Sequence, residues 1–235
     1  MTNSPLMDVA LLRDYAPYTL AGYASFRSVI ESDGAVPAKL KALFATVAAV
    51  DRRHLTLARQ EMERGVALGL TPKDATAGLI VLSSLRGEAA ALDFAQIISD
   101  SFDNVQAPQP QPLPKAGHGE AEANFRAYWA GAIPAPLGAL MRLVPEAADA
   151  YYLMRRGSID ANPLSAKYGE LLLLTILAAG YSPMAATHVR GARNAGASDE
   201  EIAEAVLCAV PSAGIAAWMA VGGMLAPPEE GGIAR

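Results

Sequence analysis

The chain has 235 residues, which is enough for one large domain or two small ones. Apolar residues make up 52% of it and charged residues 18%, a balance that excludes an extended disordered chain. With 19 basic and 24 acidic residues the formal net charge is -5, so the composition provides no basic surface for nucleic acid.

The sequence also argues against a membrane-spanning or secreted protein. Its longest apolar run, Leu171 to Gly180, is about half of the roughly 18 residues that a membrane-spanning helix needs. The N-terminal segment carries acids and lacks a basic start before an apolar stretch, unlike a signal peptide. Cys208 is the only cysteine, which excludes a disulfide framework and a CxxC redox pair. We therefore expect a cytoplasmic protein.

Helix signals recur along the chain, whereas strand signals are nearly absent. In the first half, Thr71 supplies a hydroxyl N-cap, Pro72 occupies the first helical position and Asp74 provides an acid at the third. In the second half, Ser198 and Glu201 repeat this start signal. Between such starts, apolar residues recur at intervals of three and four. The sequence therefore predicts an all-α fold.

A proline-rich segment divides the predicted helices into two blocks. Its four prolines remove amide donors and push the preceding residues out of the helical region, so no helix can cross it. We predict an N-terminal block over residues 1–104, a linker over 105–118 and a C-terminal block over 119–226. A frayed tail is expected over 227–235.

The two blocks carry matching helix boundaries. A shift of 127 positions places Gly69 on Gly196, each two residues before a hydroxyl cap. Further upstream, a shift of 128 positions pairs Arg27 with Arg155. We interpret the blocks as products of an internal duplication with one insertion or deletion.

The C-terminal block shows a specific order of residues. Glu170 lies near a helix start, Gly180 follows, and His188 lies on the next predicted helix. A glycine eight residues later precedes a hydroxyl-capped acidic helix start. In this spacing the block resembles the carboxymuconolactone decarboxylase family, within the alkylhydroperoxidase D-like superfamily. The N-terminal block shares the frame in weaker detail, so the resemblance implies two tandem alkylhydroperoxidase D-like helical repeats. It also implies a homotrimer with pseudo-six-fold symmetry.

Two departures from the family pattern bear on the chemistry. The positions of the peroxidase CxxC pair hold Tyr181 and Met184, so we expect no peroxide reduction by a thiol route. The family acid usually lies 19 residues before the histidine, whereas Glu170 lies 18 before His188 and Gly169 takes the expected place. A one-residue shift would restore the match, which leaves the register of Glu170 open.

The resemblance implies catalytic roles for His188 and Glu170. An imidazole can move a proton at neutral pH because both of its protonation states are available there. Glu170 would hold the other ring nitrogen and set the tautomer. The alternatives are a core histidine bonded to a backbone carbonyl, and an acid that favours a helix N-terminus because of the macrodipole.

Five further residues are expected to bind the substrate. They are Arg155, Tyr181, Tyr168, Tyr152 and Met184. The arginine suits a carboxylate, and tyrosines suit a small ring or lactone. Tyr181, Met184 and His188 are spaced i, i+3, i+7, which predicts one face of one helix. The alternatives are a cation at a helix C-terminus and ordinary packing.

The N-terminal block lacks the same residues. At a shift of 127, the positions of Tyr181, Met184 and His188 are taken by His54, Leu57 and Glu61. The same shift places Ala42 opposite Gly169. This favours a degenerate structural repeat, although a contribution of His54 and Glu61 to a site stays open.

We predict a cofactor-free enzyme that decarboxylates or isomerises a small carboxylated lactone or unsaturated acid. The alternative is a non-catalytic subunit of the same fold that binds a ligand or another protein. A metal site is not expected, because His54, His118 and His188 are far apart in the sequence. The sequence does not identify the exact substrate.

Overall fold

The computed structural model describes residues 4–103, 112–129 and 132–226. These residues form helices, turns and irregular segments and contain no strand, which confirms the all-α prediction. Residues 105–111 of the predicted linker and the whole predicted tail lie outside the described residues. None of the helices that are described combines the length and the apolar character required to cross a bilayer.

The described part of the N-terminal block contains a short 3-10 helix and six α-helices. They are η1 (Pro5–Asp8), α1 (Ala10–Tyr15), α2 (Pro17–Glu31), α3 (Ala38–Asp51), α4 (Leu55–Ala67), α5 (Pro72–Arg86) and α6 (Glu88–Ser101). The described part of the C-terminal block contains eight α-helices and a closing 3-10 turn. They are α7 (Glu120–Tyr128), α8 (Ala135–Leu143), α9 (Pro145–Ile159), α10 (Ala166–Ala179), α11 (Ala185–Asn194), α12 (Asp199–Leu207), α13 (Val210–Ala213), α14 (Ala216–Met219) and η2 (Gly222–Met224).

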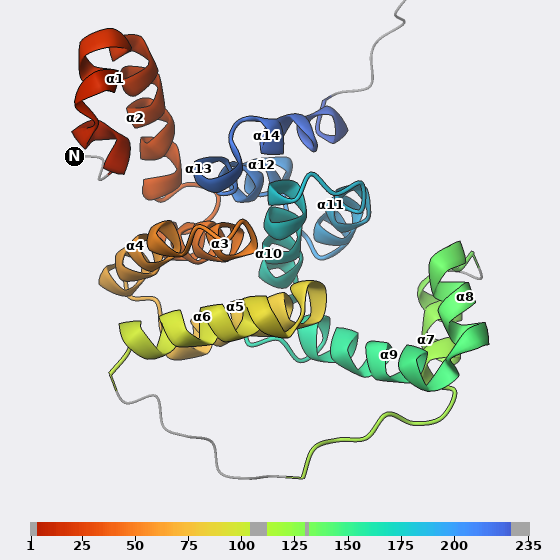
Figure 1. The fold of residues 1–235 in the computed structure, drawn as a ribbon. Helices are drawn as coiled ribbons and strands as arrows, with labels where there is room; N and C mark the ends of the chain where they lie inside the picture. Colours follow the sequence, from red (N-terminus) through yellow and green to blue (C-terminus); the bar gives the residue numbers. More distant parts are fainter. Residues whose placement is uncertain (1–3, 104–111, 130–131, 227–235) are drawn as a thin grey trace, which may run out of the picture.

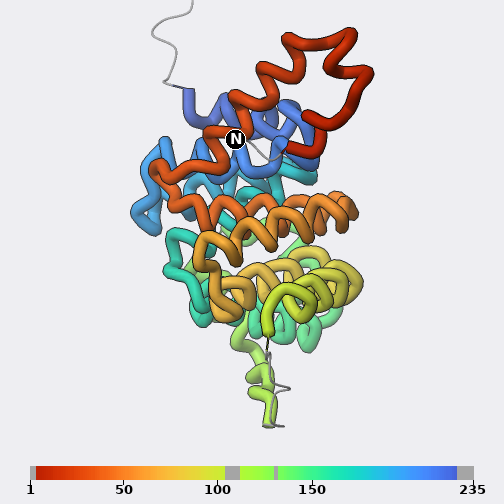
Figure 2. Tube along the Cα trace, turned by 90° about the vertical axis from the view of Figure 1, so that its left-hand side faces the viewer, coloured from red at the N-terminus to blue at the C-terminus, as the bar shows by residue number. Residues whose placement is uncertain are grey.

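Helices α3 and α10 lie against each other at the centre of the molecule (Figure 1). Almost every residue of both helices is buried, as expected for helices that are apolar on all sides. One hydrophobic core runs through both blocks and includes Phe44 of α3 and Leu172 of α10. A separate small cluster around Phe125 joins α7 to α9. Figure 2 shows the N-terminal segment and the C-terminal helices at the same end of the molecule.

The two blocks share backbone features at corresponding positions. Positive φ angles occur at three pairs of residues: Arg53 (62°) and Tyr181 (52°), Gly69 (85°) and Gly196 (86°), Gly87 (81°) and Gly214 (73°). The predicted helix starts at Thr71 and Ser198 are both complete capping boxes, as expected. These matches support the duplication that the sequence predicts.

The positive-φ pairs also locate the difference in length between the blocks. The first pair is 128 residues apart and the other two pairs are 127 apart, so the extra residue lies after α3 and before the end of α4. Helices α3 and α10 therefore align at a shift of 128, and Ala42 corresponds to Glu170. The expected pairing of Ala42 with Gly169 is wrong, because the change of register lies downstream of both residues.

A charged contact joins the two blocks near α3. The carboxylate of Glu204, on α12, accepts hydrogen bonds from the backbone N–H groups of Ala35 (3.1 Å) and Val36 (2.9 Å). It also accepts from Nζ of Lys41 at 3.0 Å. Lys41 is only 1% exposed and additionally donates to the carbonyl of Val29. Glu204 therefore neutralises a lysine that is buried in the core.

This contact predicts acid-sensitive stability. Burial by itself raises the pKa of Glu204, but the hydrogen bonds from Val36, Lys41 and Ala35 outweigh burial and lower the pKa. A lowered pKa in the folded state stabilises the protein above the unfolded value of 4.5, and this contribution is lost as the pH falls through the folded pKa. We expect urea unfolding at a series of acidic pH values to show this loss. In Glu204→Gln the dependence on pH should be flatter, whereas Glu88→Gln, at an exposed position, should keep the wild-type slope.

Candidate acid/base site in the C-terminal block

Helices α10 and α11 bring together the two residues expected to be catalytic. Ser165 caps α10, which places Glu170 in its second turn, and the turn after Gly180 leads into α11 with His188. His188 Nδ1 lies 2.7 Å from Glu170 Oε2. The imidazole is therefore held by a carboxylate and not by a backbone carbonyl. The two side chains are 19% and 8% exposed, so the pair is shielded yet accessible from one side.

The contact with Glu170 determines what the other ring nitrogen can do. Because Nδ1 donates to the carboxylate, the neutral imidazole carries its proton there and leaves a lone pair on Nε2. Within the described parts of the chain, Nε2 has no hydrogen-bond partner. The ring can therefore accept a proton at Nε2 and return it while Glu170 keeps its orientation. A general acid/base needs this combination of a fixed ring and a free nitrogen.

His188 lines a cavity of about 110 Å³. Its walls come from α7, α9, α10 and α11 of the C-terminal block and from α5 of the N-terminal block. Of the predicted substrate-binding residues, Arg155 and Met184 line this cavity. The guanidinium of Arg155 stacks on the ring of Tyr128 at 4.2 Å. No carboxylate from the described residues forms an ion pair with it, so a cation without a counter-ion lies beside His188.

The three predicted tyrosines do not line this cavity. Tyr181 has a left-handed backbone in the turn before α11, and its hydroxyl donates to the carbonyl of Ala213 at 2.5 Å. The expectation that Tyr181 shares one helix face with His188 is therefore wrong, because α11 begins only at Ala185. Tyr152 packs edge-on against Phe125.

Tyr168, the third of these tyrosines, lies on α10 and packs against the main core. The Lys167 ammonium lies 5.1 Å from the centre of its ring. Tyr168 lies in the first turn of α10, where its side chain contacts the core and the neighbouring lysine and does not line the His188 cavity.

Residues that the sequence did not single out complete the walls. Tyr128 and Trp129, at the end of α7, lie over Arg155 and Arg190 as cation–π partners. Ser84 and Ser158 place hydroxyl groups at the junction of α5 and α9. The adjacent aromatic residues were a usable signal in the sequence. The serines were not, because only the fold brings α5 next to α9.

A comparison with protein families assigns the region that contains this site. The model of the carboxymuconolactone decarboxylase family matches residues 145–225. This region is similar to that family, and we refer to it below as the family domain. It holds both Glu170 and His188 and extends from α9 to η2. A search among curated proteins finds no match to the chain.

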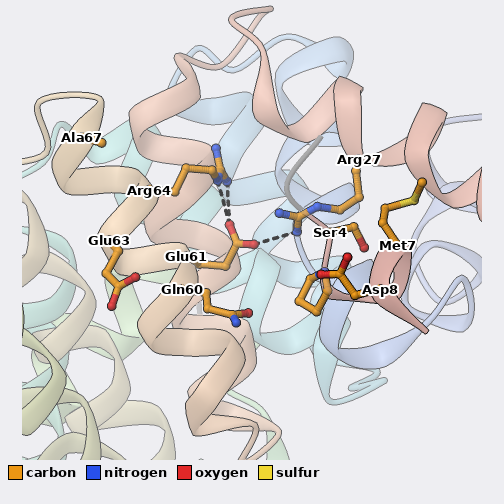
Figure 3. Close-up of a pocket in the computed structure, with 10 residues that line it drawn as sticks. Ser4, Met7, Asp8, Arg27, Gln60, Glu61, Glu63, Arg64 and Ala67 are labelled. Atoms are coloured by element: carbon orange, nitrogen blue, oxygen red, sulfur yellow. Dashed lines mark hydrogen bonds and ion pairs between the residues drawn. The ribbon is translucent and has the colours of Figure 1, made fainter. Parts of the chain in front are cut away.

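The N-terminal block has no equivalent acid/base pair at the position that matches the family domain's site. Glu61 takes the place of His188, and Ala42 takes the place of Glu170. Figure 3 shows the Glu61 carboxylate between two guanidinium groups, at 2.6 Å from Arg27 Nη1 and 2.7 Å from Arg64 Nη2. Burial alone lowers the pKa of Arg27, but the carboxylates of Glu61 and Glu31 outweigh burial and raise it. This position therefore holds an ion network of Arg27, Glu61 and Arg64 and no histidine.

A larger cavity, of about 720 Å³, lies beside this network under η1. Arg27, Glu61 and Arg64 border it and pair with one another through Arg27 Nη1 and Arg64 Nη2, whereas the buried Arg64 Nη1 has no hydrogen-bond partner among the described residues. The predicted alternative residue His54 is an exposed residue at the start of α4. We therefore place the candidate site in the family domain. The His188–Glu170 pair distinguishes it from the N-terminal position, although the N-terminal cavity is larger.

Proposed function

We propose that the protein is a cofactor-free decarboxylase or isomerase of a small carboxylated lactone or unsaturated acid. The His188–Glu170 pair carries this proposal, since a buried carboxylate fixes Nδ1 of a ring that lines a cavity, which leaves Nε2 as the nitrogen that can exchange a proton. The family domain around the pair supports a decarboxylase-like role.

Arg155 supports a substrate with a carboxylate. Its guanidinium borders the same cavity as His188 and has no acidic partner within the described ranges. A guanidinium accepts a carboxylate through two parallel hydrogen bonds, which would also orient the rest of the ligand. Stacking on Tyr128 holds the arginine in place for this contact.

Both candidate reactions use one positioned acid/base. In decarboxylation, the C–C bond to the carboxylate breaks, CO₂ leaves, and its electron pair enters a conjugated carbonyl group. His188 acts here as an imidazolium, which has taken up a solvent proton at Nε2; it delivers that proton to carbon, returns to the neutral ring and takes up another proton from the solvent before the next turnover. In isomerisation, Nε2 removes a proton from one carbon and returns it to another. Such catalysis contributes about 10²–10⁴-fold to the rate, and Glu170 acts by positioning the ring.

A panel of carboxylated lactones and unsaturated acids tests this proposal. Purified protein is saturated with each compound, and CO₂ release and ultraviolet absorbance are followed. We expect at least one compound to lose CO₂ or to shift its double bond. A panel without turnover, combined with saturable binding of the same acids, would favour a ligand-binding protein instead.

The only cysteine predicts the outcome of a redox assay. Cys208 is fully buried at the end of α12, and burial raises the pKa of its thiol to about 12. It is therefore an unreactive thiol without a resolving partner. We expect no hydroperoxide turnover with dithiol reductants, and we expect Cys208→Ser to keep wild-type activity. Loss of activity in this variant, with an unchanged melting temperature, would contradict this assignment.

We also propose that the chain assembles as a trimer with pseudo-six-fold symmetry. The apolar helix α10 does not itself argue for assembly, because α3, α5, α11 and α12 already cover it within one chain. Support comes from α1 and α2, where Leu11, Tyr15 and Tyr18 are 69%, 83% and 93% exposed. Light scattering should give about three times the chain mass of 24.5 kDa. A monomer in solution would contradict the proposal.

A further inference from the structure

The N-terminal block contributes a hydroxyl group to the His188 cavity. Ser84, in the last turn of α5, lines this cavity together with Ser158 of α9. Their Oγ atoms lie 2.6 Å apart, so one hydroxyl donates to the other. Ser158 is 3% exposed, whereas Ser84 is only partly buried and is the more accessible of the two. The pair therefore forms a short chain of hydrogen bonds that ends at Ser84.

The two serine hydroxyls have fewer protons than hydrogen-bond contacts. Ser158 Oγ also has a carbonyl acceptor, that of Met154 at 3.1 Å, and Ser84 Oγ has the carbonyl of Val81 at 3.3 Å. Each hydroxyl has one proton, so the two carbonyls and the 2.6 Å contact cannot all be served at once. When Ser158 donates to Ser84, the proton of Ser84 is left with its longest partner. A ligand oxygen in the cavity can take this proton at the expense of one weak hydrogen bond.

The equivalent cavity, which contains Tyr23 of the N-terminal block and Pro211 of the C-terminal block, lacks both hydroxyls at the matching positions. A shift of 127 places Pro211 opposite Ser84, and a shift of 128 places Ile30 opposite Ser158. Pro211 lines a cavity with Tyr23, the counterpart of Tyr151, which lines the His188 cavity. Each block thus completes a cavity of the other block. The serine pair occurs only where the His188–Glu170 pair occurs.

Resting on the proposed function, we infer that Ser84 donates a hydrogen bond to the substrate oxygen on which negative charge develops. Both candidate reactions move an electron pair into a conjugated carbonyl, whose oxygen becomes anionic. A donor fixed in a shielded site stabilises this oxygen more than water does. Ser158 is a positioning residue that donates to Ser84. The cavity then holds a carboxylate at Arg155, a proton donor at His188 and an oxyanion donor at Ser84.

A ligand that mimics the anionic intermediate tests this role without turnover. The probe is 3-nitropropionate, a small carboxylate whose nitro group is uncharged in one form and, after loss of a carbon-bound proton, becomes an enolate-like nitronate in the other. Calorimetry with each form is run on wild type, Ser84→Ala and Ser158→Ala. The matched control is Ser83→Ala, whose exposed hydroxyl donates to the Ile80 carbonyl on the same helix. Thermal melts confirm that each variant is folded.

Wild type should bind the nitronate more tightly than the nitro form. Ser84→Ala should lose about 10- to 100-fold in nitronate affinity, as expected for a hydrogen bond to a charged acceptor, and should keep its affinity for the nitro form. Ser158→Ala should lose less, and Ser83→Ala should match wild type. No binding or equal binding of the two forms by wild type, or unchanged selectivity in Ser84→Ala, would overturn the inference. If the preference for the nitronate depends on Ser84 but no lactone is turned over, the proposed reaction is refuted. The role of Ser84 as a hydrogen-bond donor then stands.

Discussion

Replacing His188 by glutamine should lower kcat/KM by about 100-fold or more, which is about 3 kcal/mol of transition-state stabilisation. An amide fills similar space and can accept the same contact geometry, but it cannot exchange a proton at the position of Nε2. Glu170→Gln should reduce turnover less, because this carboxylate lies 2.7 Å from the imidazole and orients it without reaching the substrate. Steady-state kinetics with the most active compound of the lactone panel gives both values.

Thermal melts of both variants must accompany the kinetics, so that loss of folding is not counted as loss of catalysis. His188 is partly exposed at the cavity, and we expect its replacement to leave the melting temperature close to that of wild type. Wild-type turnover in a folded His188→Gln protein would remove the acid/base role from this residue.

Glu61→Gln should lower the free energy of unfolding by about 3–5 kcal/mol, the usual cost of removing one partner of a buried ion pair. The Glu61 side chain is 2% exposed and neutralises Arg27, whose side chain is 4% exposed. A glutamine would leave this guanidinium with Glu31 as its only carboxylate. Urea unfolding measures the loss. Glu63→Gln, two residues along at an exposed position, is the matched control and should stay close to wild type.

The same variant separates the two blocks functionally. Glu61 belongs to an ion network with Arg27 and Arg64 that lacks a histidine, so folded Glu61→Gln protein should keep its turnover at low temperature. If Glu61→Gln abolishes turnover while folded and His188→Gln does not, the active site lies in the N-terminal block. An equal loss of turnover in both folded variants would indicate a site shared by the two blocks.

The fold was predictable because its signals are local. The capping boxes at Thr71 and Ser198 and the glycines at 69 and 196 are set by backbone geometry, and each occurs where the sequence indicates. The single residue of extra length in the N-terminal block was harder to locate. The side chains around Ala42 do not show how the two blocks align. The left-handed residues at 53 and 181 do, because they mark the same turn in each block.

The candidate site was predictable only in part. The His188–Glu170 contact joins α10 and α11, which follow each other in the chain, so the sequence could propose the pair although Glu170 lies one residue from the usual family position. Tyr181 was misplaced because a left-handed turn, which its spacing does not reveal, separates it from α11. Ser84 could not be found from sequence, because its role depends on α5 packing against α9 from the other block.

Proton transfer to carbon in D₂O tests whether His188 is the residue that moves the proton. The wild-type protein and His188→Gln are incubated in D₂O with a compound that the panel shows to react, and the product is analysed by NMR. We expect wild type to place deuterium on the carbon that loses CO₂ or, in an isomerisation, on the carbon that the double bond leaves. Folded His188→Gln should do so at least about 100-fold more slowly. Deuterium incorporation at equal rates in the two proteins would contradict the assignment of His188 as the residue that moves the proton.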